Sequence, residues 1–209
     1  MNSLYEQRKD FFNQRAADWL DNHYKNLETN RHDLYADRLR SIVSFLALGP
    51  DNRVLDTGCG SGVLVPYLLE HLSSAGRLIE MDFSDQMIKA NQKLHTDERI
   101  SFTCCDAAQM EFEAQSLDAV VCFAAFPHFS DPEQVIQRIS TSLKSRGRLV
   151  IGHLMSSAQL AEHHHSHTPV SQDRLPAKET MFQWITDCGL DIEAFKDEPG
   201  LYLLAAVKP

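Results

Sequence analysis

The stretch Val54-Leu-Asp-Thr-Gly-Cys-Gly-Ser-Gly62 decides the fold. An apolar run over residues 53–56 leads into it, and apolar residues at helical spacing follow it over 63–72. The three alternate glycines let the backbone turn tightly and approach a ligand closely. A strand, a glycine loop and a helix in this order are typical of the first unit of an open α/β sheet that binds a ligand at its edge.

The spacing of these glycines narrows the choice of ligand. The dinucleotide fingerprint is G-x-G-x-x-G, with a pyrophosphate at the helix N-terminus, whereas this loop reads G-x-G-x-G. Asp56 stands immediately before it, where a carboxylate would repel a pyrophosphate and would suit a cationic, amine-bearing ligand. A nicotinamide oxidoreductase is therefore a disfavoured alternative.

Strand-like and helical segments alternate along the rest of the chain. We expect strands over 53–56, 77–82, 100–105, 117–123, 148–152, 191–196 and 201–207, and a helix that begins at Asp131-Pro132 and is stopped by Gly147. The tight turn at 198–200 joins antiparallel neighbours. The pattern predicts an α/β fold: a Rossmann-like, doubly wound, seven-stranded sheet, mostly parallel with one antiparallel edge strand.

Acidic residues stand at the ends of the first three expected strands. Asp56 would face an ammonium group, Asp82 is placed to accept from ribose hydroxyls, and Asp106 could accept from an adenine amine. Each could instead serve only as a strand-end cap or turn residue. Together they describe a site for an adenosyl ligand with an amino-acid tail.

These motifs resemble those of class I S-adenosylmethionine-dependent methyltransferases. Residues 56–62, 81–87 and 105–107 are similar to the first three motifs of that family, and 117–132 to the segment that lines its cofactor and substrate side. Ser145-Arg146 departs from the usual Pro-Gly pair. The resemblance implies S-adenosylmethionine as cofactor and S-adenosylhomocysteine as product. It implies a cofactor site made by Asp56, Gly58, Cys59, Gly60, Asp82, Phe83, Met87, Asp106, Ala107, Cys122 and Phe123.

Residues 1–48 are expected to form a helical N-terminal extension, and 49–209 the methyltransferase domain. The extension carries an aromatic face with Phe12, Trp19 and Tyr24, and it resembles the lid helix of small-molecule methyltransferases. Trp19 and Tyr24 are therefore candidate substrate contacts. An ordinary packing helix is the alternative.

Two histidines should lie at the carboxyl edge of the sheet. His128 follows the fourth strand and His153 ends the fifth, so both are candidate catalytic bases. A base is needed only where the methyl acceptor carries a proton with a high pKa. The alternative is a neutral histidine bonded to backbone groups.

Four of the ten histidines fall within residues 162–168. On a helix, His163 and His167 would share one face and could grip a metal, with Asp173 as a further ligand. The segment also resembles a subgroup of small prokaryotic methyltransferases, which selects His163 and Asp173 as substrate contacts. A solvated loop is a third interpretation. A metal- or metalloid-binding protein is thus the alternative function, although we assign no metal ligand.

Composition limits the partners. The 209 residues carry a net charge of −9, and an acidic surface is a poor partner for nucleic acid. The N-terminus lacks the apolar core of a signal peptide, and no apolar stretch reaches the length of a membrane helix. The five cysteines form no CxxC pair. We therefore expect a cytoplasmic monomer or homodimer that acts on a small-molecule methyl acceptor, without nucleic acid or membrane.

Overall fold

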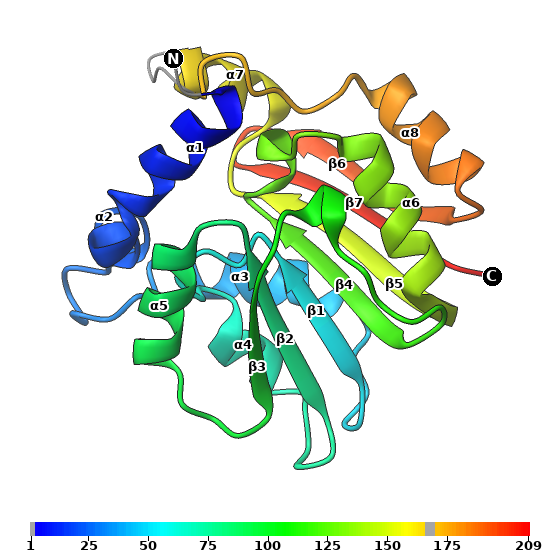
Figure 1. The fold of residues 1–209 in the computed structure, drawn as a ribbon, viewed down its shortest axis with the longest axis horizontal. Coiled ribbons are helices and arrows are strands. Elements are labelled where there is room, and N and C mark those ends of the chain that lie inside the picture. Colours follow the sequence, from blue (N-terminus) through cyan, green and yellow to red (C-terminus); the bar gives the residue numbers. More distant parts are fainter. Residues whose placement is uncertain (1–2, 166–169) are drawn as a thin grey trace.

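The computed structural model describes residues 3–165 and 170–209. One seven-stranded sheet has the order β3-β2-β1-β4-β5-β7-β6 (Figure 1). Its strands are β1 (Arg53–Thr57), β2 (Arg77–Asp82), β3 (Ile100–Cys104), β4 (Leu117–Phe123), β5 (Leu143–His153), β6 (Asp191–Glu198) and β7 (Leu201–Val207). β1 to β5 pair in parallel, while β7 is antiparallel to β5 and β6. The predicted sheet is confirmed, with the antiparallel strand one place in from the edge and β6 outermost.

Helices cover both faces of the sheet because neighbouring strand residues point to opposite sides. Leu55 packs with buried side chains of α6 (Pro132–Ser142) and α8 (Lys178–Asp187). Its neighbour Val54 packs with α3 (Ala36–Ser44) and α4 (Val65–Leu69) on the other face. The protein is therefore a three-layer α/β structure with β1 and β4 at its centre.

Two helices begin directly after a side chain that caps them, and one of these caps, Asp131, is at the predicted helix start. The Ser84 hydroxyl accepts from the Met87 N–H at 3.1 Å at the start of α5 (Asp85–Leu94). The Asp131 carboxylate accepts from the Gln134 N–H at 3.0 Å at the start of α6, with Pro132 in the first turn. These caps fix where the loops after β2 and β4 end, and both loops belong to the site.

The predicted end of α6 at Gly147 is wrong. The helix ends at Ser142 and β5 begins at once. Leu117 pairs with Leu143 and Ala119 with Arg148, so the chain bulges out between these pairs. Arg146 adopts φ 64° in the bulge, and its N–H donates to the Lys208 carbonyl at 2.7 Å. An arginine thus takes the left-handed conformation at this turn.

The N-terminal segment crosses the carboxyl edge of the sheet (Figure 1). It contains α1 (Leu4–Asn13), the 3₁₀ turn η1 (Ala16–Asp18) and α2 (Trp19–Tyr24). The Ser84 hydroxyl donates to the Asn13 side-chain oxygen at 2.6 Å, which ties the end of α1 to the start of α5. Phe12 and Ala16 form a small buried cluster with Met87 and Val170. The segment therefore packs on the loops that follow the strands.

The remaining elements are short. They are the 3₁₀ turns η2 (Ala107–Gln109) and η3 (Phe126–His128) and the helix α7 (Ser157–His165). Within residues 3–165 and 170–209, no helix combines the length and the apolarity needed to cross a bilayer.

Candidate active site

The glycine loop between β1 and α4 is bonded to the end of β2. The N–H groups of Gly58 and Cys59 both donate to the Met81 carbonyl, at 2.7 and 3.0 Å. Gly58, Gly60 and Gly62 all have positive φ, the conformation that favours glycine. A Cβ on Gly58 would lie 2.2 Å from the Ala125 Cβ, so this turn has no room for any other residue.

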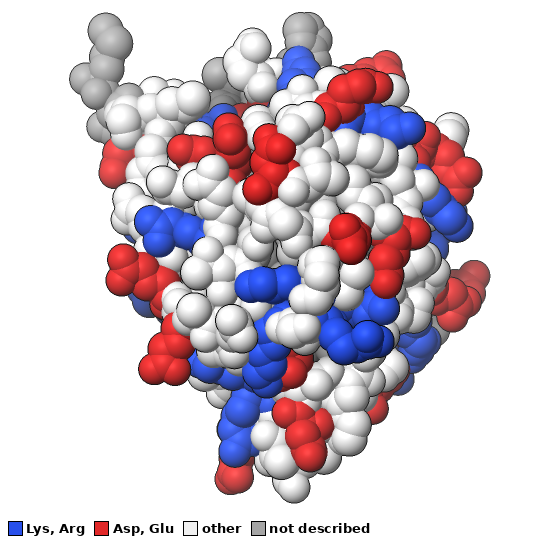
Figure 2. Space-filling model, turned by 90° about the vertical axis from the view of Figure 1, so that its right-hand side faces the viewer, with Lys and Arg blue, Asp and Glu red and all other residues white. Residues whose placement is uncertain are grey.

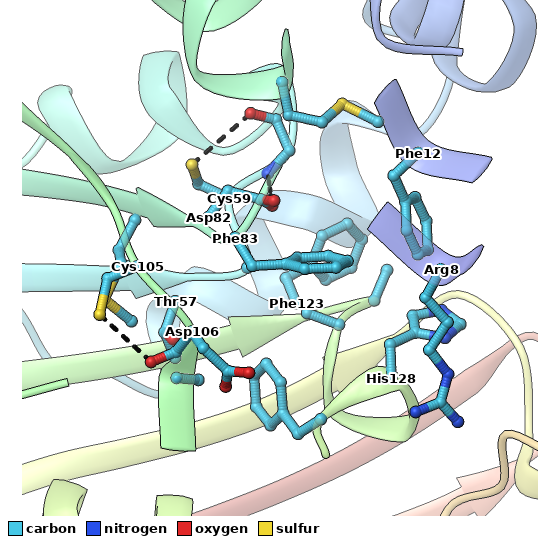
Figure 3. Close-up of a pocket in the computed structure, with 18 of the residues that line it drawn as sticks. Arg8, Phe12, Thr57, Cys59, Asp82, Phe83, Cys105, Asp106, Phe123 and His128 are labelled. Atoms are coloured by element: carbon cyan, nitrogen blue, oxygen red, sulfur yellow. Dashed lines mark hydrogen bonds between the residues drawn. The ribbon is translucent and has the colours of Figure 1, made fainter. Parts of the chain in front are cut away.

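A pocket opens beside this loop, at the carboxyl ends of β1, β2, β3 and β4 (Figure 3). Its empty volume, including the open solvent at its mouth, is about 840 Å³. Seven aromatic side chains contribute to the wall, and Arg8, Asp82, Asp106 and His128 are its charged or imidazole groups. The aromatic members are Tyr5, Phe12, Trp19, Tyr24, Phe83, Phe123 and Phe129.

Asp82 is held rigidly at the end of β2. One carboxylate oxygen accepts from the Gly60 N–H at 2.9 Å and the other from the Ser84 N–H at 2.8 Å. Burial raises the pKa of Asp82 to about 6, although these backbone hydrogen bonds oppose the rise. The side chain thus joins the glycine loop to the start of α5 and presents acceptor oxygens to the pocket.

Asp56 lies behind the pocket wall at the end of β1 and is 1% exposed. Its Oδ1 atom has no hydrogen-bond partner although it is buried. Burial, together with the neighbouring Glu80 and Asp82, raises its pKa well above the ordinary value. A buried acceptor without a partner is costly, so a donor supplied by a ligand would stabilise it.

Glu80 adds a further buried carboxyl group, one that the sequence analysis did not single out. It accepts from the Asn91 side-chain amide at 2.7 Å, and burial raises its pKa to about 8. Asn91 is also what stands against Gly62, where a Cβ would lie 2.3 Å from its side-chain oxygen. Asn91 and Glu80 therefore support the glycine loop, and neither residue lines the pocket.

Asp106 lies on the opposite side of the pocket, after β3. Its Oδ1 accepts from the Ala108 N–H at 2.8 Å, and its Oδ2 accepts from the Ser130 hydroxyl at 3.4 Å. Ala107 and Phe129 line the wall beside it. Phe83 and Met87 line the part nearest β2 and α5. A flat heterocycle would find an apolar slot here with a carboxylate at its rim.

His128 lies in η3, which follows the carboxyl end of β4, and it lines the pocket. Its Nδ1 is 2.7 Å from Oδ2 of Asp173, whose side chain is fully buried. The other oxygen of Asp173 accepts from Arg8 on α1. The Phe12 ring meets the imidazole edge-on, with the centroids 5.1 Å apart. The structure therefore brings together two predicted residues, His128 and Asp173, and adds one that was not predicted, Arg8.

Most of the residues predicted for the cofactor line this pocket. They are Gly58, Cys59, Gly60, Asp82, Phe83, Met87, Asp106, Ala107 and Phe123. Cys122 does not, because its side chain is fully buried in the core beneath α6. Asp56 stands behind the wall. Of the predicted substrate residues, Trp19 and Tyr24 line the pocket, and Asp173 reaches it only through His128 and Arg8.

Two predicted histidines lie elsewhere. His153 ends β5, outside the pocket wall, and its Nδ1 accepts from the Met155 N–H at 3.0 Å. His163 is exposed on α7 and does not line the pocket. His167 lies outside the described residues, and among the residues that are described no group of three His, Cys, Asp or Glu side chains could hold a metal. The predicted i, i+4 metal pair therefore has no structural description here.

Comparison with known proteins finds that this chain is similar to methyltransferases. The methyltransferase domain family matches residues 55–151. The malonyl-(acyl-carrier protein) O-methyltransferase of Priestia megaterium is 28% identical over 132 residues, 60% of this chain and 47% of that protein. The ubiquinone biosynthesis O-methyltransferase of Coxiella burnetii is 29% identical over 116 residues, 54% of this chain and 47% of that protein. The chain thus spans about half the length of these curated relatives.

The fold is shared with solved structures over the full chain. A geranyl diphosphate methyltransferase in complex with GPP and sinefungin superposes with a TM-score of 0.78 and 13% identity, covering 100% of this chain and 99% of the other. At that identity the likeness concerns the fold alone. Residues 55–151 thus match a methyltransferase domain family, and the fold of the chain is one that solved methyltransferase structures share.

Proposed function

We propose that this protein transfers a methyl group from S-adenosylmethionine to a small-molecule acceptor and releases S-adenosylhomocysteine. The observation that carries the proposal is the arrangement of Asp56, Asp82 and Asp106 at the ends of β1, β2 and β3 around the glycine loop. The matched family and the methyltransferase relatives support the same activity.

Each carboxyl group has a separate part in holding the cofactor. The unpartnered Oδ1 of Asp56 would take the ammonium group of the methionine tail. Asp82 would accept from the ribose hydroxyls, and Asp106 from the adenine amine. A Cβ added at Gly60 would come no closer than 3.9 Å to the Met87 sulfur and 4.0 Å to the Trp19 indole nitrogen, so the ligand can approach the backbone there. Phe83, Met87 and Ala107 would cover the adenine.

The cofactor supplies an activated methyl group on a cationic sulfur. The protein's task is then alignment, since an in-line displacement between well-placed partners needs little further help. The acceptor atom bonds to the methyl carbon as the carbon–sulfur bond breaks, and a protonated acceptor must lose its proton. His128 would take that proton, because it lines the pocket and a carboxylate orients its ring.

The acceptor side of the pocket favours an apolar or aromatic small molecule. Phe12, Phe123 and Phe129 supply the wall, and Arg8 and His128 supply the polar groups. The two curated relatives are named for malonyl-(acyl-carrier protein) and for ubiquinone biosynthesis, and both names are consistent with a small-molecule or carrier-bound acceptor. The net charge of −9 argues against nucleic acid.

Calorimetry with S-adenosylhomocysteine tests the cofactor, and a radiolabelled methyl donor tests transfer. We expect binding at micromolar concentration, then label in one member of a panel of phenols, thiols and carboxylic acids. With that acceptor, His128→Asn should lower turnover about 100-fold or more, the usual contribution of a general base. Absence of S-adenosylhomocysteine binding at high micromolar concentration would contradict the proposal.

Cofactor binding should strengthen as the pH rises from 5 to 7. With a pKa of about 6, Asp82 is mostly protonated at pH 5, and the ribose hydroxyls need the carboxylate. Binding at pH 5 must therefore expel a proton, which weakens affinity about tenfold per pH unit below the pKa. Calorimetry in two buffers of different ionisation enthalpy measures the released proton directly. The release should be smaller in Asp82→Asn, where only Asp56 can still contribute a proton, and an affinity that is flat from pH 5 to 7 would refute the assignment.

A further inference from the structure

We propose that Arg8 is a positioning residue: it joins the docked α1 to the His128–Asp173 pair, so that His128 is oriented for proton transfer only while α1 covers the pocket. The inference rests on the proposed methyl transfer for its purpose, but its structural content can be tested without any cofactor.

Arg8 contacts the His128–Asp173 pair through the carboxylate of Asp173. Arg8 and His128 bind different oxygens of Asp173, whose side chain is fully buried, while the Arg8 side chain is 15% exposed. Arg8 and Asp173 lie 165 residues apart in the sequence, so the bond joins the N-terminal helix to the loop after α7. A buried carboxylate is costly unless it is paired, and loss of one partner destabilises its position strongly.

The loop that carries Asp173 depends on α1 in a second way. Val170 is 3% exposed, and it is buried in the cluster that contains Phe12 and Ala16 from the N-terminal segment. The Asp173 N–H donates to the Val170 carbonyl at 2.9 Å, so this packing and the carboxylate are parts of one turn. Withdrawal of α1 would remove both the guanidinium and the apolar support of the turn, and Asp173 would then leave His128.

The same helix also covers the proposed adenosine wall. The Phe83 ring contacts Phe12 and Tyr5 of α1 at centroid distances of 5.7 and 5.8 Å. Figure 3 shows Phe12 and Arg8 reaching down from α1, with Phe12 toward Phe83 and Arg8 beside His128. Because Tyr5, Arg8 and Phe12 all line the pocket, α1 lies against any cofactor bound there. Closure over the cofactor and orientation of His128 are therefore one event.

The pairing also fixes which ring nitrogen can act as the base. A carboxylate only accepts hydrogen bonds, so Nδ1 of His128 must carry the proton that it shares with Asp173. In the neutral ring the lone pair is then on Nε2. This tautomer is the one required for taking a proton from an acceptor, and it is retained only as long as Asp173 stays in place.

The rate at which S-adenosylhomocysteine is released tests whether the Arg8–Asp173 contact holds α1 over the pocket. Trp19 lines the pocket and reports its occupancy by fluorescence once Trp184 is replaced by Phe. In that background we expect stopped-flow release to be at least tenfold faster in Arg8→Gln and in Asp173→Asn, and no faster in the double variant than in the singles. Arg15→Gln, which removes a guanidinium stacked over Phe11 just beyond α1, should leave the rate unchanged. Release at the wild-type rate in Arg8→Gln would overturn the proposal.

Proton NMR on ¹⁵N-histidine-labelled, ligand-free protein tests the link to His128 separately. We expect an Nδ1–H signal of His128 that exchanges slowly in the wild type and in Arg15→Gln, is lost in Arg8→Gln, and returns in part in Arg8→Lys. Persistence of the signal in Arg8→Gln would show that Arg8 only fastens the lid, which overturns the positioning role. Failure of the wild type to bind S-adenosylhomocysteine would instead refute the methyltransferase proposal. The NMR result would still be interpretable, because it is obtained without a ligand.

Discussion

Asp82→Ala should abolish cofactor binding while the protein remains folded. The carboxylate would give the ribose charge-assisted hydrogen bonds of about 1.5–3 kcal/mol each, so the loss of two predicts a Kd increase of about 10²- to 10⁴-fold. The change also removes the acceptor for the Gly60 and Ser84 N–H groups and loosens the glycine loop. Calorimetric titration with S-adenosylhomocysteine measures the loss.

The matched control is Asp85→Ala, three residues further along the same loop. Asp85 is exposed at the start of α5, where it pairs with Lys89 at 3.0 Å and does not line the pocket. Its replacement should leave the affinity within about twofold, since an exposed ion pair contributes little. If Asp82→Ala binds as tightly as Asp85→Ala, Asp82 does not hold the ribose.

Strand ends near the glycine loop were predictable because local sequence determines them. Alternating glycines specify the turn after β1, and Asp82 follows an apolar run whose length sets its position at the edge of the sheet. Parallel strands bring such ends together whatever lies between them. For this reason Asp82 and Asp106 could be placed in one site from the sequence alone, together with the glycines.

The direction in which a side chain faces, and the position of a strand end relative to the pocket, were not predictable in this way. Cys122 belongs to the matched segment, but side chains alternate along β4, and its own turns into the core while Phe123 reaches the pocket. His153 does end a strand at the correct edge. However, strand order switches between β1 and β4, so the pocket forms over β1 to β4, and β5 ends beyond it.

No feature of the sequence indicated a role for Arg8 in the site. Arg8 is one of two adjacent basic residues, the other being Lys9, in an amphipathic N-terminal helix, and such residues usually face solvent. Its partner Asp173 was selected by resemblance as a substrate contact, whereas the structure shows it bonded to Arg8 and His128. Only the packing of α1 on the loop at 170–173 brings the two together, and that packing involves residues too far apart for periodicity to reveal it.

The second large effect is expected from Gly58→Ala. Gly58 has φ 75°, which costs an alanine about 1–2 kcal/mol. The added Cβ would also lie 2.2 Å from the Ala125 Cβ, which belongs to a short side chain that cannot rotate away. Overpacking of this kind costs about 1–3 kcal/mol more, so the free energy of unfolding should fall by about 2–5 kcal/mol. Urea unfolding followed by circular dichroism measures it.

Gly189→Ala separates the two contributions. Gly189 has nearly the same φ, 73°, but nothing lies within 4 Å of an added Cβ, so only the backbone term of about 1–2 kcal/mol should appear. The difference between the two variants then measures the contact of the glycine loop with the Ala124–Ala125 turn after β4. That contact holds the cofactor loop against the segment that carries His128, so Gly58→Ala should also lose S-adenosylhomocysteine binding, whereas Gly189→Ala should keep it. Equal losses of stability in the two variants would mean that the loop can move away from Ala125 at no cost.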